Sequence, residues 1–248
     1  MTRTISVRCL ILVTIVLTIT CTHMVEYYSI LESSPYIDYG TSSTPEISDG
    51  AHGIDFGVGG SYAHTTASSD TSIGVKAIHG LTRARITSAI EWGLSGSFLW
   101  EDGTFPYILT DMKFRLPQTS VIICPDIGLG VGIGRRGVTY NVQFATFFGY
   151  PLAKTRVNLY VVPKIILFTY RYRVVYGPIS KDIDYATSTM YGASLGFNFV
   201  LPLTHEENRV THTIKVKPEI SYVRGTEPHH TKISFSIIQF GLQTYYSF

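Results

Sequence analysis

From residue 51 to the C-terminus, apolar residues alternate with small or polar residues at a period of two. Successive side chains of a β-strand point to opposite faces, so this period predicts strands rather than helices. Between residues 191 and 198, for example, Tyr191, Leu195 and Phe197 fall on one face, whereas Ser194 and Asn198 fall on the other. The pattern recurs in ten segments: 51–66, 71–80, 85–100, 105–116, 120–134, 137–152, 156–176, 188–203, 211–224 and 231–248.

The composition of the second face indicates the surroundings of these strands. A soluble sheet shows water a face of Lys, Glu and Thr, but here that face is mostly Gly, Ser, Thr, Ala and Asn with isolated charges. Such residues fit the confined lumen of a barrel whose other face meets lipid. Ten strands cannot leave two open edges in lipid, because unpaired backbone groups are very costly there. We therefore predict an all-β fold, a closed antiparallel transmembrane β-barrel of about ten strands.

The last segment ends on aromatic residues. Phe240, Leu242, Tyr246 and Phe248 share one face, and Gly241 lies seven residues before the end. This stretch resembles the closing strand of bacterial outer-membrane β-barrel proteins. The resemblance implies that Gly241, Tyr246 and Phe248 form a signal for the barrel-assembly machinery, and that outer-membrane lipid surrounds the protein. An ordinary soluble edge strand is the alternative.

The N-terminal part of the chain does not alternate. Arg3 and Arg8 precede an apolar run over residues 9–20, a pattern that predicts a signal peptide over residues 1–21. Cys21 follows the run and resembles the lipid-attachment point of bacterial lipoproteins, while cleavage near this point without lipid is the other interpretation. Residues 22–50 are predicted to be a periplasmic linker or N-terminal segment, which could also enter the barrel as a small plug. The barrel domain is expected over residues 51–248.

Several classes of function are excluded or disfavoured by the sequence. The net charge of +2, without a basic run interleaved with aromatics, does not indicate nucleic-acid binding. Cys9 and Cys21 lie in or beside the leader, which leaves Cys124 alone and gives neither a disulfide framework nor a metal site. Adjacent His229 and His230 would point to opposite faces of a strand, which disfavours chelation of one ion. No cofactor is indicated.

The connections between segments suggest the topology. An even number of strands places both chain ends on one side, predicted to be periplasmic, with the connections after odd segments facing outward. Residues 80–85 and 204–210 are expected to be periplasmic connections, and residues 177–187 an extended outer loop. We expect a bulge near Ile165–Ile166 and a similar shift at Ile237–Ile238, because the apolar pattern changes phase there.

The predicted inward face carries isolated charges that are the candidate functional residues. Barrels of about eight strands are already filled by side chains, whereas open water channels need roughly sixteen. The charges therefore predict either a structural network of ion pairs or a narrow conduit for small solutes. They are Asp55, Lys76, Glu91, Asp111, Lys113, Arg115, Asp126, Lys164, Lys215, Lys217 and Glu219.

Other functions would depend on residues at the predicted outer rim. A surface-exposed adhesin or partner-binding barrel would act through residues 177–187 and the His229–His230 turn. The outer-membrane proteases called omptins are also ten-stranded, but Asp182 and Asp184 are not accompanied by the Asp-x-His element of that family. An acyl hydrolase would need a rim Ser beside a His, and no motif joins such a pair. We predict that the chain is not an enzyme; a soluble lipocalin-like barrel, with its apolar face inward, is the remaining alternative.

Overall fold

The computed structural model describes residues 53–67, 72–101, 103–117, 121–134, 137–152, 156–176, 179–206, 209–226 and 234–247. These residues form a single antiparallel sheet, and within them no helix is long and apolar enough to cross a membrane. The predicted all-β barrel of about ten strands is confirmed. The strands are β1 (Ile54–Ala67), β2 (Ser72–Thr87), β3 (Ile90–Glu101), β4 (Gly103–Phe114), β5 (Ile122–Gly134), β6 (Gly137–Pro151), β7 (Val157–Tyr176), β8 (Ile179–Glu206), β9 (Arg209–Thr226) and β10 (Ser234–Ser247).

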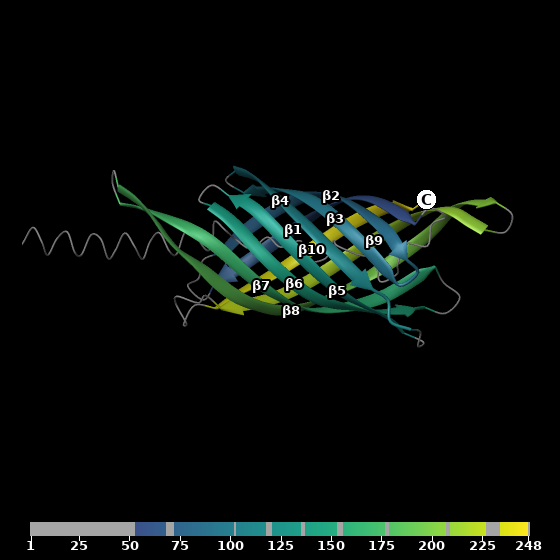
Figure 1. Ribbon diagram of the computed structural model, residues 1–248. Helices are drawn as coiled ribbons and strands as arrows, with labels where there is room; N and C mark the ends of the chain where they lie inside the picture. Colours follow the sequence, from purple (N-terminus) through teal and green to yellow (C-terminus); the bar gives the residue numbers. More distant parts are fainter. Residues whose placement is uncertain are drawn as a thin grey trace, which may run out of the picture.

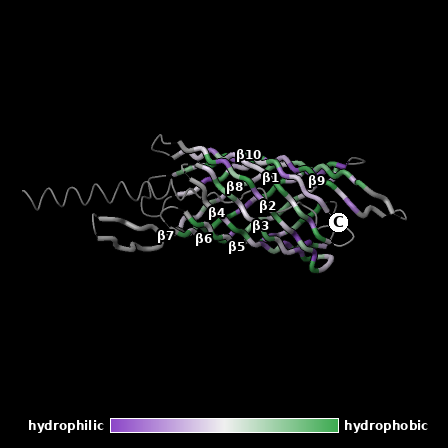
Figure 2. Tube along the Cα trace, turned by 90° about the horizontal axis from the view of Figure 1, so that it is seen from above, coloured by the Kyte–Doolittle hydropathy of each residue, from purple (hydrophilic) through white to green (hydrophobic). Residues whose placement is uncertain are grey.

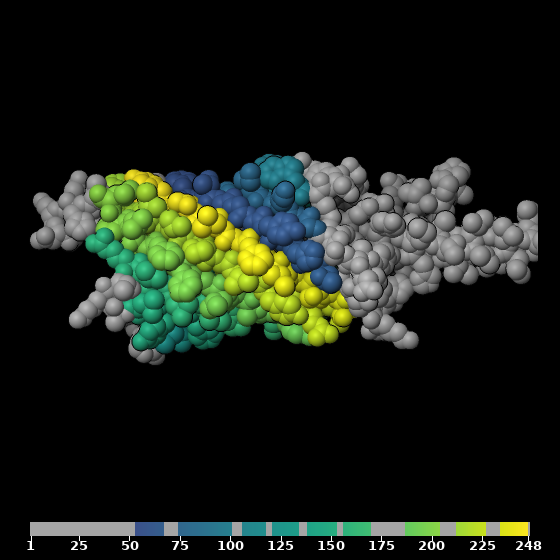
Figure 3. All heavy atoms as spheres, turned by 180° about the vertical axis from the view of Figure 1, so that it is seen from behind, coloured from purple at the N-terminus to yellow at the C-terminus, as the bar shows by residue number. Residues whose placement is uncertain are grey.

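The sheet closes because the first and last strands pair with each other. Each strand is antiparallel to its neighbours in the chain, and β1 pairs with β10 from Asp55–Ser247 to Ala67–Phe235. The strands are strongly tilted to the barrel axis (Figure 1), as closure of a sheet requires. In the space-filling view, β10 lies directly beside β1 along the barrel wall (Figure 3). We call the end with Ile54 and Ser247 the terminal end, and the other the distal end.

The outer surface of the barrel is apolar. Val58, Phe98, Leu129 and Phe240 are each more than half exposed, which is typical of side chains that face lipid. Figure 2 shows hydrophobic and hydrophilic positions alternating along the strands, as the period of two predicts. A lipocalin-like barrel would place this apolar face inward, so that alternative is wrong.

The predicted connection at residues 80–85 is wrong. β2 continues to Thr87 and joins β3 through a turn at Ser88 and Ala89. Arg83 was expected in this connection, but it is buried inside the barrel and pairs with Glu91 of β3. The buried ion pair between Arg83 and Glu91 stabilises the β2–β3 hairpin in the region where a connection was expected.

The long connections expected at residues 177–187 and 204–210 are also mostly strand. β7 and β8 remain paired to Tyr176–Ile179, and β8 and β9 remain paired to Glu206–Arg209. The β7–β8 hairpin projects beyond the barrel at the distal end, and the β8–β9 hairpin projects at the terminal end (Figure 1). Polar residues at these hairpin ends suggested loops, but cross-strand pairing holds them in extended conformation.

The two expected phase shifts are not present. Ile166 and Phe168 are both buried inside, and Ile165 and Leu167 are outward, so alternation continues through Ile165–Ile166. It also continues through Ile237–Ile238, because Ile237 is buried and Ile238 is exposed. The β7–β8 register shifts instead between Arg171 and Tyr172. The inner face accepts apolar residues here, so hydrophobicity alone did not indicate which way a side chain points.

The closing strand places its predicted assembly residues differently on its two faces. Tyr246 is outward and stacks on His212 of β9, with ring centroids 5.7 Å apart and a hydroxyl-to-Nδ1 distance of 2.9 Å. Gly241 lies at an inward position, where an added Cβ would lie 3.8 Å from the Cβ of Ser61. Phe248 lies outside the described residues, and its role in assembly stays a prediction.

We predict that Tyr246→Ala combined with Phe248→Ala lowers the folded fraction of the protein in the outer membrane. The double change removes aromatic groups from the strand that must close the barrel. The measurement is the heat-modifiable band on a gel of outer-membrane fractions. Tyr222→Ala is the control, because Tyr222 is also outward but lies on β9. Normal folded levels of the double variant would contradict a signal in β10.

Candidate functional site in the barrel lumen

Most of the predicted inward charges do line the lumen. Nine of them are buried at inward positions, Arg115 follows the end of β4 and is half-buried, and Lys76 is exposed on the outer surface. The nine are Asp55, Glu91, Asp111, Lys113, Asp126, Lys164, Lys215, Lys217 and Glu219.

The prediction for Lys76 is wrong. Its neighbours Val75 and Ala77 are buried inside the barrel, so Lys76 points outward, in register between Tyr62 of β1 and Trp100 of β3. Because Val75 and Ala77 are apolar, they were expected to face lipid, and Lys76 between them was therefore expected to face the lumen. A lysine can lie along an apolar surface while its ammonium group reaches the polar boundary of the membrane, and aromatic neighbours are typical there.

The first ion-pair network joins three neighbouring strands around Arg83. Arg83 Nε donates to Glu91 Oε1, and its terminal nitrogens donate to Asp111 Oδ1 and Oδ2 at 2.5 and 3.1 Å. Lys113 Nζ lies 2.9 Å from Glu91 Oε1, and Asp126 faces Lys113 across the β4–β5 ladder. The bidentate Arg–carboxylate contact is among the stronger buried pairings. Sequence reasoning missed Arg83, although it shares its face of β2 with His79.

The second network lies on β7, β9 and β1. Lys217 Nζ is 3.3 Å from Glu219 Oε2, the same oxygen that accepts a 2.7 Å hydrogen bond from the Tyr160 hydroxyl. Lys215 Nζ lies 3.6 Å from Asp55 Oδ2, which connects β9 to β1. These contacts neutralise charges that could not remain buried without partners.

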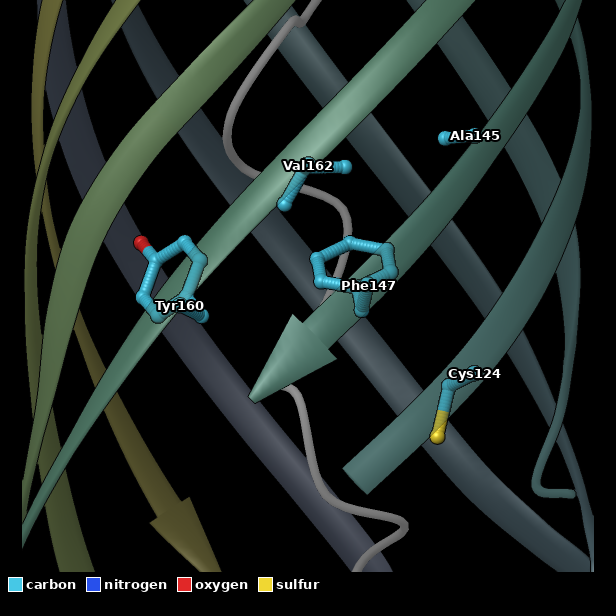
Figure 4. Close-up of a cluster of buried hydrophobic side chains, with 5 residues drawn as sticks. All are labelled: Cys124, Ala145, Phe147, Tyr160 and Val162. Atoms are coloured by element: carbon cyan, nitrogen blue, oxygen red, sulfur yellow. The ribbon is translucent and has the colours of Figure 1, made fainter. Parts of the chain in front are cut away.

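Phe147 connects the two networks across the lumen. Lys113 Nζ and Lys217 Nζ each lie 6.0 Å from the centroid of the Phe147 ring, and Lys217 Nζ lies 5.0 Å from that of Tyr160. Cations at such distances are attracted by an aromatic ring. Phe147 and Tyr160 also belong to the buried cluster with Cys124, Ala145 and Val162 on β5, β6 and β7 (Figure 4). Side chains of β4, β6, β7 and β9 therefore meet inside the barrel.

A polar layer lies farther toward the distal end. His79 Nε2 is 2.9 Å from Ser61 Oγ, and His79 Nδ1 is 2.8 Å from Ser97 Oγ. Gln239 Nε2 donates to Ser61 Oγ at 3.1 Å. A serine within hydrogen-bond reach of a histidine is found in nucleophilic hydrolases. This pair lies inside the barrel, however, and not at the rim expected for an acyl hydrolase.

The residues proposed for other chemistry do not form a site in the described part of the chain. Asp182 and Asp184 belong to β8, and the backbone of Asp182 lies opposite Arg173 in the β7–β8 ladder, so the expectation that they lie in an extended outer loop is wrong. His229, His230, Cys21 and residues 22–50 lie outside the described residues. Within the described ranges, no group of three or more His, Cys, Asp or Glu side chains could hold a metal ion.

The closed ten-stranded wall, its apolar outer surface and its buried polar lumen define the class of the protein. It is a β-barrel whose apolar outer face is suited to lipid, and this is the fold of outer-membrane β-barrel proteins. No family model matches the sequence, and no curated protein matches it either.

Solved structures similar to the chain are outer-membrane barrels with low sequence identity. The translocator domain of the autotransporter NalP from Neisseria meningitidis is 8% identical, with 93% of this chain and 98% of that chain covered and a TM-score of 0.45. Neisserial surface protein A is 12% identical, with 79% and 97% covered and a TM-score of 0.38. The outer-membrane protease OmpT from Escherichia coli is 9% identical, with 79% and 96% covered and a TM-score of 0.39.

We predict that Lys113→Met destabilises the barrel by about 3 kcal/mol, because it removes one partner of a buried ion pair. Lys76→Met should change stability by less than ~0.5 kcal/mol, because Lys76 is exposed and outside the lumen. The measurement is urea unfolding of the refolded protein in lipid vesicles. Equal effects of the two matched substitutions would contradict the assignment of these lysines to opposite faces.

Proposed function

We propose that the protein is a non-conducting structural barrel that holds the β7–β8 hairpin at the cell surface for contact with a partner. The observation that carries the proposal is the continued pairing of β7 and β8 past the barrel wall, from Arg171–Tyr185 to Tyr176–Ile179. The lumen contacts argue against the narrow-conduit interpretation.

A small-solute conduit would need a continuous polar path along the lumen. Instead, Lys113, Phe147 and Lys217 meet between strands that are far apart in the wall, and all three are buried. Opening a path would separate paired charges from their partners, which is costly in a confined site. These contacts support a structural network.

The projecting hairpin has the composition of an interaction surface. Its β7 arm contains Tyr170, Tyr172 and Tyr176 together with Arg171 and Arg173. Tyr and Arg are enriched at protein interfaces, where they supply much of the binding energy. The hairpin also extends past the ladder partners on either side, because β6 pairs with β7 only as far as Thr139–Tyr170 and β8 pairs with β9 from Met190–Gly225. Strand edges of this kind can add a strand from a partner.

The direction of the hairpin follows from the strand number. Ten strands place the start of β1 and the end of β10 at one end, which we assign to the periplasm as in other barrels of this class. The β7–β8 hairpin lies at the opposite end and would then project outside the cell (Figure 1).

We predict that the refolded full-length protein is silent in planar-bilayer recordings, because the lumen contacts leave no open polar path. A heat-modifiability gel first confirms that the recorded sample is a closed barrel. Discrete and reproducible openings would contradict a sealed lumen and restore the conduit interpretation.

We predict that shortening the hairpin abolishes adhesion without affecting barrel assembly. In the shortened chain, an Asn-Gly turn replaces residues 170–186 and joins Thr169 to Thr187, which face each other across the ladder. The measurement is binding of whole cells displaying the protein to epithelial monolayers and to immobilised matrix proteins. Adhesion should fall to the level of cells without the protein.

A matched variant tests whether the hairpin side chains matter or only its length. Arg171→Gln with Arg173→Gln keeps the hairpin but removes its two β7 arginines, and adhesion should fall by about tenfold or more, corresponding to a loss of ~1.4 kcal/mol. Unchanged adhesion by the shortened chain, with normal folded levels in the outer membrane, would contradict the proposal.

A further inference from the structure

We infer that the outer wall near the distal end carries a binding site for the phosphate headgroup of an anionic lipid, formed by Lys76 between Tyr62 and Trp100. The site lies on the lipid-facing side of β1, β2 and β3, and it does not depend on the function proposed for the β7–β8 hairpin. Three observations support it: the side-chain donors of these residues, the charge of the outer wall, and the open backbone below the lysine.

The three side chains lie at one level on adjacent strands. Lys76 of β2 faces Tyr62 of β1 in one ladder and Trp100 of β3 in the other. All three point outward and are exposed, Tyr62 by 42% and Trp100 by 39%. β3 ends at Glu101, so this level lies close to the distal rim. Tyr and Trp are enriched where a membrane surface meets water, which is the depth of lipid headgroups.

The side-chain donors at this level are available to a ligand. An ammonium group and an indole N–H can only donate hydrogen bonds, and a phenol hydroxyl can donate one. Lys76, Tyr62 and Trp100 make no side-chain hydrogen bond or ion pair with another side chain that the structure describes. Trp92, the other outward tryptophan of β3, donates instead to Thr110 Oγ1 at 2.9 Å. A ligand rich in acceptor oxygens, such as a phosphate group, therefore matches the three donors.

A glycine brings the Tyr62 hydroxyl onto the strand that carries the lysine. Gly74 is the next outward position of β2 on the distal side of Lys76. A Cβ added at Gly74 would lie 2.7 Å from the Tyr62 hydroxyl oxygen and 3.2 Å from Cε2 and Cζ of the ring. The ring of Tyr62 therefore lies across β2 at a place where only glycine leaves room for it, and its hydroxyl borders the site on the distal side.

The charge of the outer wall favours an anion. Among the outward strand side chains that the structure describes there are two cations, Lys76 and Arg224, and no Asp or Glu. Arg224 also lies toward the distal end, where it faces Tyr191 across the β8–β9 ladder. Outward residues toward the terminal end, such as Ile86 and Leu203, are apolar and 59 and 51% exposed. Lysine and arginine at a membrane surface attract anionic lipids.

The wall below the lysine can accommodate an acyl chain. The next outward pair toward the terminal end is Ile78 and Phe98, which are 55 and 56% exposed. Beyond it, Gly80 and Gly96 face each other across the ladder, and a Cβ added at either would meet nothing within 4 Å. Packing inside the barrel does not require these two glycines, and they leave the backbone open to lipid. A chain that descends from a headgroup at Lys76 can lie against it.

The test uses the two tryptophans of the chain as reporters. Trp92→Phe leaves Trp100 beside the site, and Trp100→Phe leaves Trp92 toward the terminal end. Each variant is refolded, checked by heat modifiability, and placed in phosphatidylcholine vesicles that contain the same minor fraction of brominated phosphatidylglycerol or of brominated phosphatidylcholine. Bromine on an acyl chain quenches the fluorescence of a tryptophan that it contacts. The ratio of quenching by the two lipids therefore measures which lipid is preferred beside the ring.

For Trp100 we expect a preference of about fivefold for phosphatidylglycerol, the effect of one lysine near a membrane surface. Lys76→Gln should remove the preference, and Lys76→Arg should keep it. Arg224→Gln is the matched control, because it removes the other outward cation and should leave the preference at Trp100 unchanged. Trp92 should show no preference.

Equal quenching of Trp100 by the two lipids would overturn the inference. A preference of the same size at Trp92, or an equal loss in Lys76→Gln and Arg224→Gln, would also overturn it, because the attraction would then come from the charge of the whole barrel. Lys76 and Arg224 are exposed, so both variants should fold. None of these measurements involves adhesion by the β7–β8 hairpin, so the two proposals fail independently.

Discussion

The structure depends on pairing every backbone hydrogen-bonding group of a sheet that lies in lipid. An unpaired strand edge cannot find water there, so the first and last strands must meet. The β1–β10 ladder does this with thirteen paired positions. Closure places the C-terminal strand next to the first, and the even number of strands puts the start of β1 and the end of β10 at the same end of the barrel. The arrangement of the lumen and of the projecting hairpins follows from this closure.

A closed wall of ten strands confines the charges on its inner face. Within so small a space a buried charge needs a partner, and neighbouring strands supply such partners, as in Arg83–Glu91 and Lys113–Glu91. Aromatic rings then fill the remaining space, with Phe147 between Lys113 and Lys217. A lumen built in this way stabilises the barrel, and we therefore propose that the parts that extend beyond it make contact with other molecules.

The period of two was sufficient to predict the fold, because strands in a lipid-facing sheet must alternate regardless of tertiary detail. It also placed nine charges inside correctly. It failed where the inner face is apolar: Val75 and Ala77 made Lys76 appear inward, and Phe168 suggested a bulge that is not present. Arg83 was missed because residues 80–85 were predicted to be a connection, whereas its buried carboxylate partners on β3 and β4 are determined only by register. Hydrophobicity identifies the face of a strand only when one face is polar.

β8, the longest strand, shows which parts of the sheet can lie in lipid, because strand edges there must be paired. β8 is paired on both sides only between Met190 and Phe199. Pairing with β9 begins at Met190, toward the distal end, and pairing with β7 ends at Phe199. That span matches the ~9–11 residues of a tilted strand that crosses a bilayer. The remainder of β8 has one open edge in each hairpin, which is tolerated in water but not in lipid. Both hairpins must therefore lie outside the hydrocarbon layer, where their edges are available to other chains.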